Sequence, residues 1–177
     1  MNQKFIDLYD AYLQEHLDRR DFFKRLTVLA GSVAAANAIL LLLENSSARA
    51  EIVPKDDPRL ESADITYPGA TGQVQGYLAM PKGAAKLPGV VVIHENRGLN
   101  PHIEDVARRV ALEGYLAIAP DALSPVDGTP DDPDKARDLI GKLDDKSTQE
   151  NYFAAVTFLK THPASTGKVG VIGFCWG

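Results

Sequence analysis

Apolar and polar residues alternate along the second half of the chain in a way that predicts strands of two kinds. Residues 63–67 and 73–80 alternate with a period of two on either side of Pro68-Gly69, which predicts an antiparallel hairpin. Three later runs are apolar almost throughout, as expected for strands that are buried on both faces. These runs are 90–93, 115–119 and 168–174.

Segments with a helical spacing of apolar residues separate the buried strands. They cover 101–113, where Asn100 or Pro101 begins the helix and Gly114 follows it, 134–143 and 148–160. A polar, Pro/Asp-rich loop at 120–133 precedes the second of them. Strands that alternate with helices predict a parallel sheet with right-handed crossovers. The predicted fold class is therefore α/β, an antiparallel leading hairpin followed by parallel strands with helices on both faces.

The first fifty residues have a different pattern, which is typical of an export signal. Arg19-Arg20-Asp21-Phe22-Phe23-Lys24 precedes a charge-free apolar run at 26–43, and Ala48-Arg49-Ala50 follows as a small-residue site. This order is that of a secretory signal, and the paired arginines resemble a twin-arginine signal. We expect cleavage after Ala50 and a periplasmic product; an uncleaved anchor in the inner membrane is the alternative. The predicted division is a signal at 1–50, an extended leader at 51–61 and the main domain at 62–177.

Composition limits the function further. The chain has 177 residues and a net charge of -5, which argues against a nucleic-acid partner. A single cysteine rules out a disulfide within the chain, and no Cys/His cluster has the spacing of a zinc site. No metal or cofactor is therefore expected. The oligomeric state remains open.

The last buried run leads into Gly173-Phe174-Cys175-Trp176-Gly177, a G-x-C-x-G sequence. It is the cysteine form of the nucleophile elbow, in which a sharp turn after a strand projects the nucleophile from the sheet. Glycines two residues before and after the nucleophile allow the backbone to pack closely around that turn. The backbone N–H of Trp176 is then a candidate oxyanion-hole donor. A buried structural cysteine is the alternative interpretation of Cys175.

Three blocks of sequence together resemble the dienelactone hydrolases (carboxymethylenebutenolidases), a family of α/β-hydrolases. They are Val90–Asn100, Gly114–Asp121 and Lys168–Gly177, in the family's order, and the resemblance covers nearly all of 60–177. It implies that Cys175 is the nucleophile and that Glu95 is the carboxylate that contacts the resting thiol. It also implies that the Asn96 backbone N–H is the second oxyanion donor. The implied substrates are small esters or lactones.

Two features depart from the family pattern. The arginine that binds the substrate carboxylate is expected after the strand at 115–121, but Ala122-Leu123-Ser124-Pro125 stands there, which puts dienelactone itself in doubt. The family's acid and histidine follow the nucleophile, so the resemblance implies an incomplete α/β-hydrolase fold, truncated at the elbow and inactive alone. A non-catalytic remnant or a ligand-binding module are the alternatives. His94 is interpreted as a core residue, Asp121 as a loop cap and the acidic run 127–134 as solvated.

Overall fold

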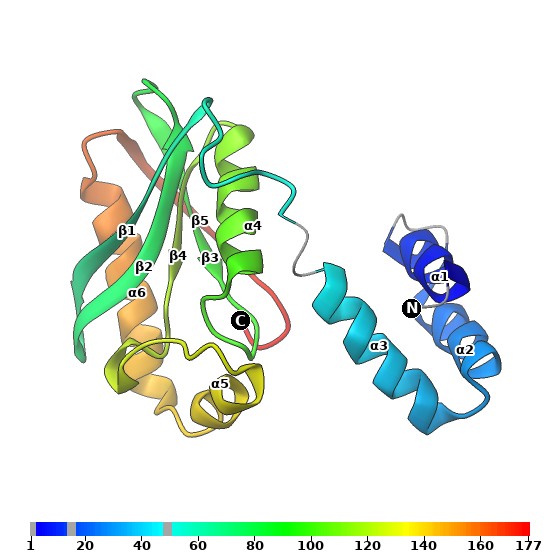
Figure 1. Ribbon diagram of the computed structural model, residues 1–177. Helices are drawn as coiled ribbons and strands as arrows, with labels where there is room; N and C mark the ends of the chain where they lie inside the picture. The colour runs from blue at the N-terminus through cyan, green and yellow to red at the C-terminus, as the bar shows by residue number, and fades with distance from the viewer. Residues whose placement is uncertain (1–2, 14–16, 48–50) are drawn as a thin grey trace. The chain divides into compact units, whose positions relative to one another are not determined.

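The computed structural model describes residues 3–13, 17–47 and 51–177, which fall into two compact units, Met1–Ala50 and Glu51–Gly177. Figure 1 shows a unit of helices alone and a unit built on a sheet. The predicted signal cleavage site at 48–50 lies outside the described residues. Each unit is described separately below.

The N-terminal unit consists of α1 (Gln3–Leu13), α2 (Arg19–Ala30) and α3 (Val33–Ser47). Asp18 caps α2 by accepting a hydrogen bond from the Asp21 N–H at 2.9 Å. Gly31, with φ of +81°, ends α2 in the left-handed conformation that glycine adopts readily. The helices pack around a small core of Tyr9, Phe22, Leu26 and Ala36.

The predicted apolar run at 26–43 is therefore divided between two helices. Among the described residues no single helix is long and apolar enough to span a bilayer. The segments Arg20–Ala30 and Val33–Leu40, which meet at a bend of 109°, together have the length and composition of a span.

The second unit is built on a five-stranded sheet with the order β1-β2-β4-β3-β5. The strands are β1 (Leu60–Gly69), β2 (Gly72–Pro81), β3 (Leu87–Ile93), β4 (Leu116–Pro120) and β5 (Ser165–Gly173). β1 pairs with β2 and β2 with β4 in antiparallel fashion, while β3 is parallel to both β4 and β5. The predicted hairpin and parallel strands are confirmed, although β1 begins within the predicted leader. The prediction that the last strand is buried on both faces is wrong for this structure, because β5 is at the edge of the sheet and is mostly exposed.

Helices cover both faces of this sheet. They are α4 (Pro101–Leu112), α5 (Pro133–Ile140) and α6 (Asp145–Thr161), and a short 3₁₀ helix, η1 (Ser124–Val126), lies in the loop after β4. Asn100, Asp132 and Asp144 cap α4, α5 and α6 with side-chain oxygens. Figure 1 shows α4 and α6 on opposite sides of the strands.

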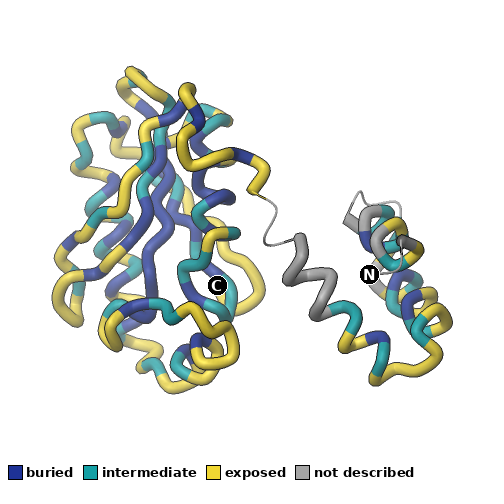
Figure 2. The backbone as a smooth tube through the Cα atoms, in the orientation of Figure 1, coloured by how far each residue is buried: buried dark blue, intermediate teal, exposed yellow. Residues whose placement is uncertain are grey.

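Two hydrophobic clusters bury the faces of the sheet, and Figure 2 shows the central strands as the most deeply buried part of this unit. On one face α4 packs Ile103 and Ala107 against Val92 and Ala119. On the other face α6 packs Ala155 and Leu159 against strands that include Val91 and Ile118. Because neighbouring residues of β3 point to opposite faces, both Val91 and Val92 are fully buried.

A charged network, which the apolar pattern of α4 does not reveal, holds residues 51–53 against that helix. Asp105 accepts hydrogen bonds from the backbone N–H groups of Ile52 and Val53 at 3.1 and 2.8 Å. Arg108, whose side chain is fully buried, donates to the Val53 carbonyl at 2.7 Å and to the Tyr77 hydroxyl at 3.0 Å. The start of the predicted leader is thus a packed part of the second unit.

Candidate active site

The turn after β5 has the geometry that a nucleophile elbow requires. Cys175 adopts φ of +56°, in the left-handed region that non-glycine residues rarely occupy. The Gly177 N–H donates to the Phe174 carbonyl at 3.0 Å and closes the turn, and the Phe174 N–H donates to the Ile93 carbonyl at 3.3 Å. The cysteine is exposed at the tip of this turn. Strained backbone of this kind clusters at functional sites, because the surrounding structure must hold it in place.

The two glycines of the elbow are required by close approaches of the backbone. A Cβ added at Gly173 would lie 2.5 Å from the carbonyl carbon of Gly177. A Cβ added at Gly177 would lie 2.6 Å from Ile93 Cγ2 and 3.0 Å from the Ile93 carbonyl oxygen. The spacing of G-x-C-x-G thus matches a turn that folds back tightly on its own strand and on β3.

The pairing of β3 with β5 brings the predicted site residues to one edge of the sheet. Ile93 pairs with Gly173, so Glu95 and Cys175 each lie two residues beyond the paired position. Glu95 and Asn96 are half-buried in the loop after β3, and Figure 1 shows the chain end beside that loop. This is the carboxyl edge of the parallel strands, where open α/β sheets bind ligands.

His94 is a fully buried structural residue rather than a free base. Its Nε2 accepts a hydrogen bond from the Ala122 N–H at 3.1 Å, so in the neutral ring Nδ1 carries the proton and donates to the Glu95 carbonyl at 2.6 Å. Burial lowers the pKa of His94, although the Glu95 carbonyl and the charge of Asp121 oppose that shift. The interpretation of His94 as a core histidine with satisfied hydrogen bonds is confirmed.

Asp121 holds together the loops behind the site. Its carboxylate accepts hydrogen bonds from the Leu123 N–H at 2.9 Å, the Thr129 N–H at 2.7 Å and the Thr129 hydroxyl at 2.8 Å. The Thr129 hydroxyl oxygen also accepts from the Leu99 N–H at 2.9 Å. This confirms Asp121 as a loop cap and links the loop after β3 to the loop after β4.

Gly98 makes the approach of these two loops possible. Its φ is +74°, and a Cβ there would overlap the Thr129 hydroxyl. A side chain at this position would therefore separate the loop that carries Glu95 and Asn96 from its support.

Trp176 of the elbow contacts two aromatic rings. Its ring stacks on His94, with centroids 5.4 Å apart and planes inclined by 12°, and is tilted against Tyr152 of α6 at 6.5 Å. A cavity of about 260 Å³ adjoins Trp176, Gly177 and Ile93 and is lined on its other side by α6. The Tyr152 hydroxyl is buried there without a hydrogen-bond partner, and burial raises its pKa well above the ordinary value.

The sequence singled out neither Tyr152 nor Thr129. Tyr152 lies in a helix whose apolar residues were expected only to pack on the sheet, and Thr129 lies in a loop described by its prolines and carboxylates. The one usable signal was that the loop at 120–133 follows a buried strand and so begins at the carboxyl edge.

The positions that follow β4 are apolar and covered. Leu123 is fully buried and Ala122 nearly so, and Ala122 is held by its hydrogen bond to His94. The arginine missing from this stretch of sequence is thus replaced by core packing. The predicted solvated run is confirmed for Asp127, Asp131, Asp132 and Asp134, which are all exposed, and Asp132 caps α5. Within 3–13, 17–47 and 51–177, no group of three or more His, Cys, Asp or Glu residues is placed to hold a metal ion.

Comparison with known proteins agrees with the fold of the second unit. The profile of the "Dienelactone hydrolase family" matches residues 74–177. A protein of Escherichia coli named "Putative hydrolase fragment YghX" is 52% identical over 112 residues, which cover 62% of this chain and 96% of that protein. A "Putative carboxymethylenebutenolidase" of Methylorubrum extorquens is 31% identical over 173 residues, covering 96% of this chain and 58% of that protein.

Among solved structures, the "Putative Dienelactone Hydrolase" of Klebsiella pneumoniae is 31% identical and superposes with a TM-score of 0.58, over 67% of this chain and 51% of that one. The chain thus spans about half the length of most of the curated carboxymethylenebutenolidase-like relatives and solved dienelactone hydrolases that it matches.

Proposed function

Because this chain belongs to the dienelactone hydrolase family, we propose that it supplies the nucleophile and oxyanion site of a hydrolase of small esters or lactones. The observation that carries the proposal is the left-handed backbone of Cys175 between two glycines that leave no room for a Cβ. A buried structural cysteine needs neither exposure nor a strained turn, so this geometry favours the nucleophile.

The proposed chemistry has two steps. The thiolate of Cys175 attacks the acyl carbon, the bond to the alcohol oxygen breaks and a thioester forms; water then hydrolyses the thioester and restores the thiol. Glu95 is proposed to accept the thiol proton. The backbone N–H groups of Asn96 and Trp176 are proposed to donate to the oxyanion of each tetrahedral intermediate. The pairing of Ile93 with Gly173, which brings Glu95 and Cys175 to one edge, supports this assignment.

We propose that residues 1–177 alone turn over slowly. Of the described histidines, His94 has both ring nitrogens committed to hydrogen bonds, His162 follows α6 at the opposite edge of the sheet, and His102, in the first turn of α4, has no hydrogen bond to Cys175. Loss of a catalytic base removes most of the activity of a triad, because its members act as a unit. We expect these residues to bind substrate or to form the acyl-enzyme, but to release product only slowly.

The preferred substrate is proposed to have an uncharged acyl group. Ala122 and Leu123 stand where the family resemblance implies an arginine for the substrate carboxylate, and both are buried. Without a guanidinium at these positions, a substrate carboxylate lacks the partner that the family resemblance implies, and an unpaired buried charge is costly.

Residues 1–50 are proposed to be a twin-arginine-like signal that directs the protein to the periplasm, or anchors it in the inner membrane if uncleaved. The separation of the chain into units at Ala50 and Glu51 supports a detachable segment. The packing of residues 51–53 on α4 supports a second unit that begins directly after it.

The test is acylation of the full chain by p-nitrophenyl acetate, followed by intact mass. Cys175 is the sole cysteine, so one added acetyl group that is absent from Cys175→Ala reports this thiol. The matched control is Thr157→Ala, which removes a hydroxyl from an exposed position of α6 away from the elbow and should leave the labelling unchanged. Equal labelling of wild type and Cys175→Ala would refute the assignment. Substrate binding without acylation would favour a ligand-binding module. The absence of both binding and acylation would favour a non-catalytic remnant.

A further inference from the structure

The helical N-terminal unit exposes aliphatic side chains that its own core does not need. Val28 is 82% exposed, Val33 57% and Leu29 43%, whereas Phe22 and Leu26 of α2 are buried. Apolar side chains that gather on a surface in this way mark an interaction site.

Basic side chains surround these aliphatic residues. The segment Arg19–Ala30 contains four basic residues and one acidic residue. Arg20, Lys24 and Arg25 are exposed, and Lys24 lies near Asp21 at 3.5 Å in an ion pair that is itself open to water. The segment Arg19–Ala30 is therefore basic, although the chain as a whole is acidic.

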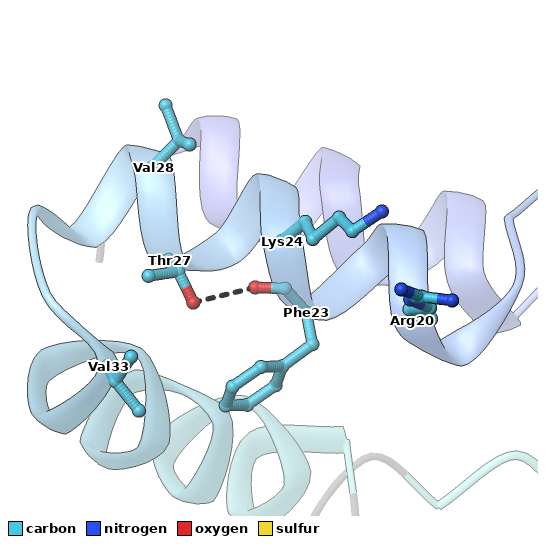
Figure 3. A pocket seen from close by; sticks show the side chains of 6 residues that line it. All are labelled: Arg20, Phe23, Lys24, Thr27, Val28 and Val33. Carbon is cyan, nitrogen blue, oxygen red and sulfur yellow. Dashed lines mark hydrogen bonds between the residues drawn. The ribbon is translucent and has the colours of Figure 1, made fainter.

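The two kinds of side chain line the same groove. A hollow of about 820 Å³ is bordered by Arg20, Phe23, Lys24, Thr27, Val28 and Val33. Figure 3 shows Lys24 and Val28 projecting from one side of α2, one turn apart, and Phe23 directed toward α3. A second hollow joins Lys24 and Arg25 to Val28 and Leu29, so Val28 stands between two apolar surfaces.

We propose that this α2 face (Arg20, Lys24, Arg25, Val28, Leu29 and Val33) docks on the surface of a bilayer that contains anionic phospholipids. Helices with an aliphatic side beside lysine and arginine lie in the interface, where the aliphatic groups enter the acyl boundary and the cations meet the headgroups. The bend of 109° between Arg20–Ala30 and Val33–Leu40 fits a surface arrangement, since within the described residues neither helix alone is long and apolar enough to cross. The inference rests on the proposed export role of residues 1–50 and is independent of ester hydrolysis.

The charge complementarity decides between occupants. A purely apolar partner would explain Val28 and Val33 but not the three cations beside them. A zwitterionic membrane would gain little from those cations, whereas an anionic surface attracts each of them.

The experiment is co-flotation of the full chain with vesicles of phosphatidylcholine, with and without phosphatidylglycerol, at low and high salt. Strong binding is expected only with phosphatidylglycerol, and it should weaken at high salt. The double variant Arg20→Gln/Lys24→Gln should weaken binding about 25-fold, which is about fivefold for each charge removed. Val28→Asp should also weaken binding, and its high exposure makes the change compatible with folding.

The matched control is Lys135→Gln/Lys146→Gln, which removes the same charge from exposed helix positions of the second unit and should leave binding unchanged. Equal binding to both lipid mixtures, no binding to either, or equal losses in the control would overturn the inference. Binding to native membranes that protease treatment abolishes would assign the surface to a membrane protein and overturn it as well. The cellular location of the full chain is measured separately: export without lipid binding overturns this inference alone.

Discussion

Replacing Arg108 with methionine is expected to destabilise the second unit strongly. The side chain is fully buried, and it donates to the Val53 carbonyl and the Tyr77 hydroxyl while lying 3.8 Å from the Asp105 carboxylate. Methionine keeps much of the aliphatic volume but removes the cation, which leaves the carboxylate of Asp105 buried at 2% exposure without its charge partner. Breaking a buried pair on one side costs about 3–5 kcal/mol, a large part of the stability of an ordinary domain.

The assay is urea unfolding of the full chain followed by the fluorescence of Trp176, the sole tryptophan, which lies in the second unit. Arg109→Met is the matched control, because Arg109 is the next residue of α4 and is exposed. The control should lose less than about 1 kcal/mol, the usual limit for a cation near a helix C-terminus.

A further variant separates the charge from the packing. Asp105→Asn together with Arg108→Met should be less destabilising than Arg108→Met alone, because the most deeply buried carboxylate near Arg108 is then removed with the cation. Equal loss of stability in Arg108→Met and Arg109→Met would refute the reasoning.

Three other predictions concern the site and the sheet edge. Burial lowers the pKa of His94, so as pH falls the unfolded state binds a proton before the folded state does. The free energy of unfolding should therefore decrease as pH drops below about 6.5. The urea midpoint of His94→Gln, which does not titrate at this position, should decrease less over the same pH range. Parallel losses in both proteins would contradict this. Gly98→Ala should lower the free energy of unfolding by more than about 1 kcal/mol, because the new Cβ would have a positive φ and would overlap Thr129. Gly170→Ala is the control, because open space surrounds Gly170. Equal effects of the two variants in urea unfolding would contradict the loop contact. Val171→Lys should reduce aggregation, measured as concentration-dependent light scattering, because Val171 is 53% exposed on the edge strand β5. Phe153→Lys on α6 is the control. Equal reductions in the two variants would rule out the edge strand as the cause of aggregation.

The parallel core of the fold could be predicted because its strands have an unmistakable pattern. Val90–Ile93 and the runs at 116–119 and 169–173 are apolar without interruption, and all three lie in strands of the sheet. The helix after Asn100 was also predicted, since a capping asparagine and Pro101 mark its start. The apolar spacing of this helix does not reveal all of its buried residues, because Asp105 and Arg108 are buried as well. A charged residue on a helix is normally solvated, and only the docking of residues 51–53 reverses that expectation.

The site was predicted as far as local sequence reaches. The glycines around Cys175 carry a steric requirement that a short pattern can express, and the close approaches at Gly173 and Gly177 show that requirement. The support of the site depends on contacts between distant residues, such as Thr129 with Leu99, which no local pattern encodes. In the N-terminal unit, Gly31 divides a run that its composition presents as continuous, because a glycine among alanines changes hydropathy little but allows a left-handed turn.

The stacking of Trp176 on His94 allows the elbow to be followed by tryptophan fluorescence. No other indole is present in the chain, so every change in tryptophan emission originates one residue from Cys175. Acylation of the thiol, entry of a ligand into the cavity beside Tyr152, or protonation of the imidazole would each alter the surroundings of that one ring. The protein therefore carries a built-in fluorescent reporter of its candidate site, and titrations of that site can be followed without any label.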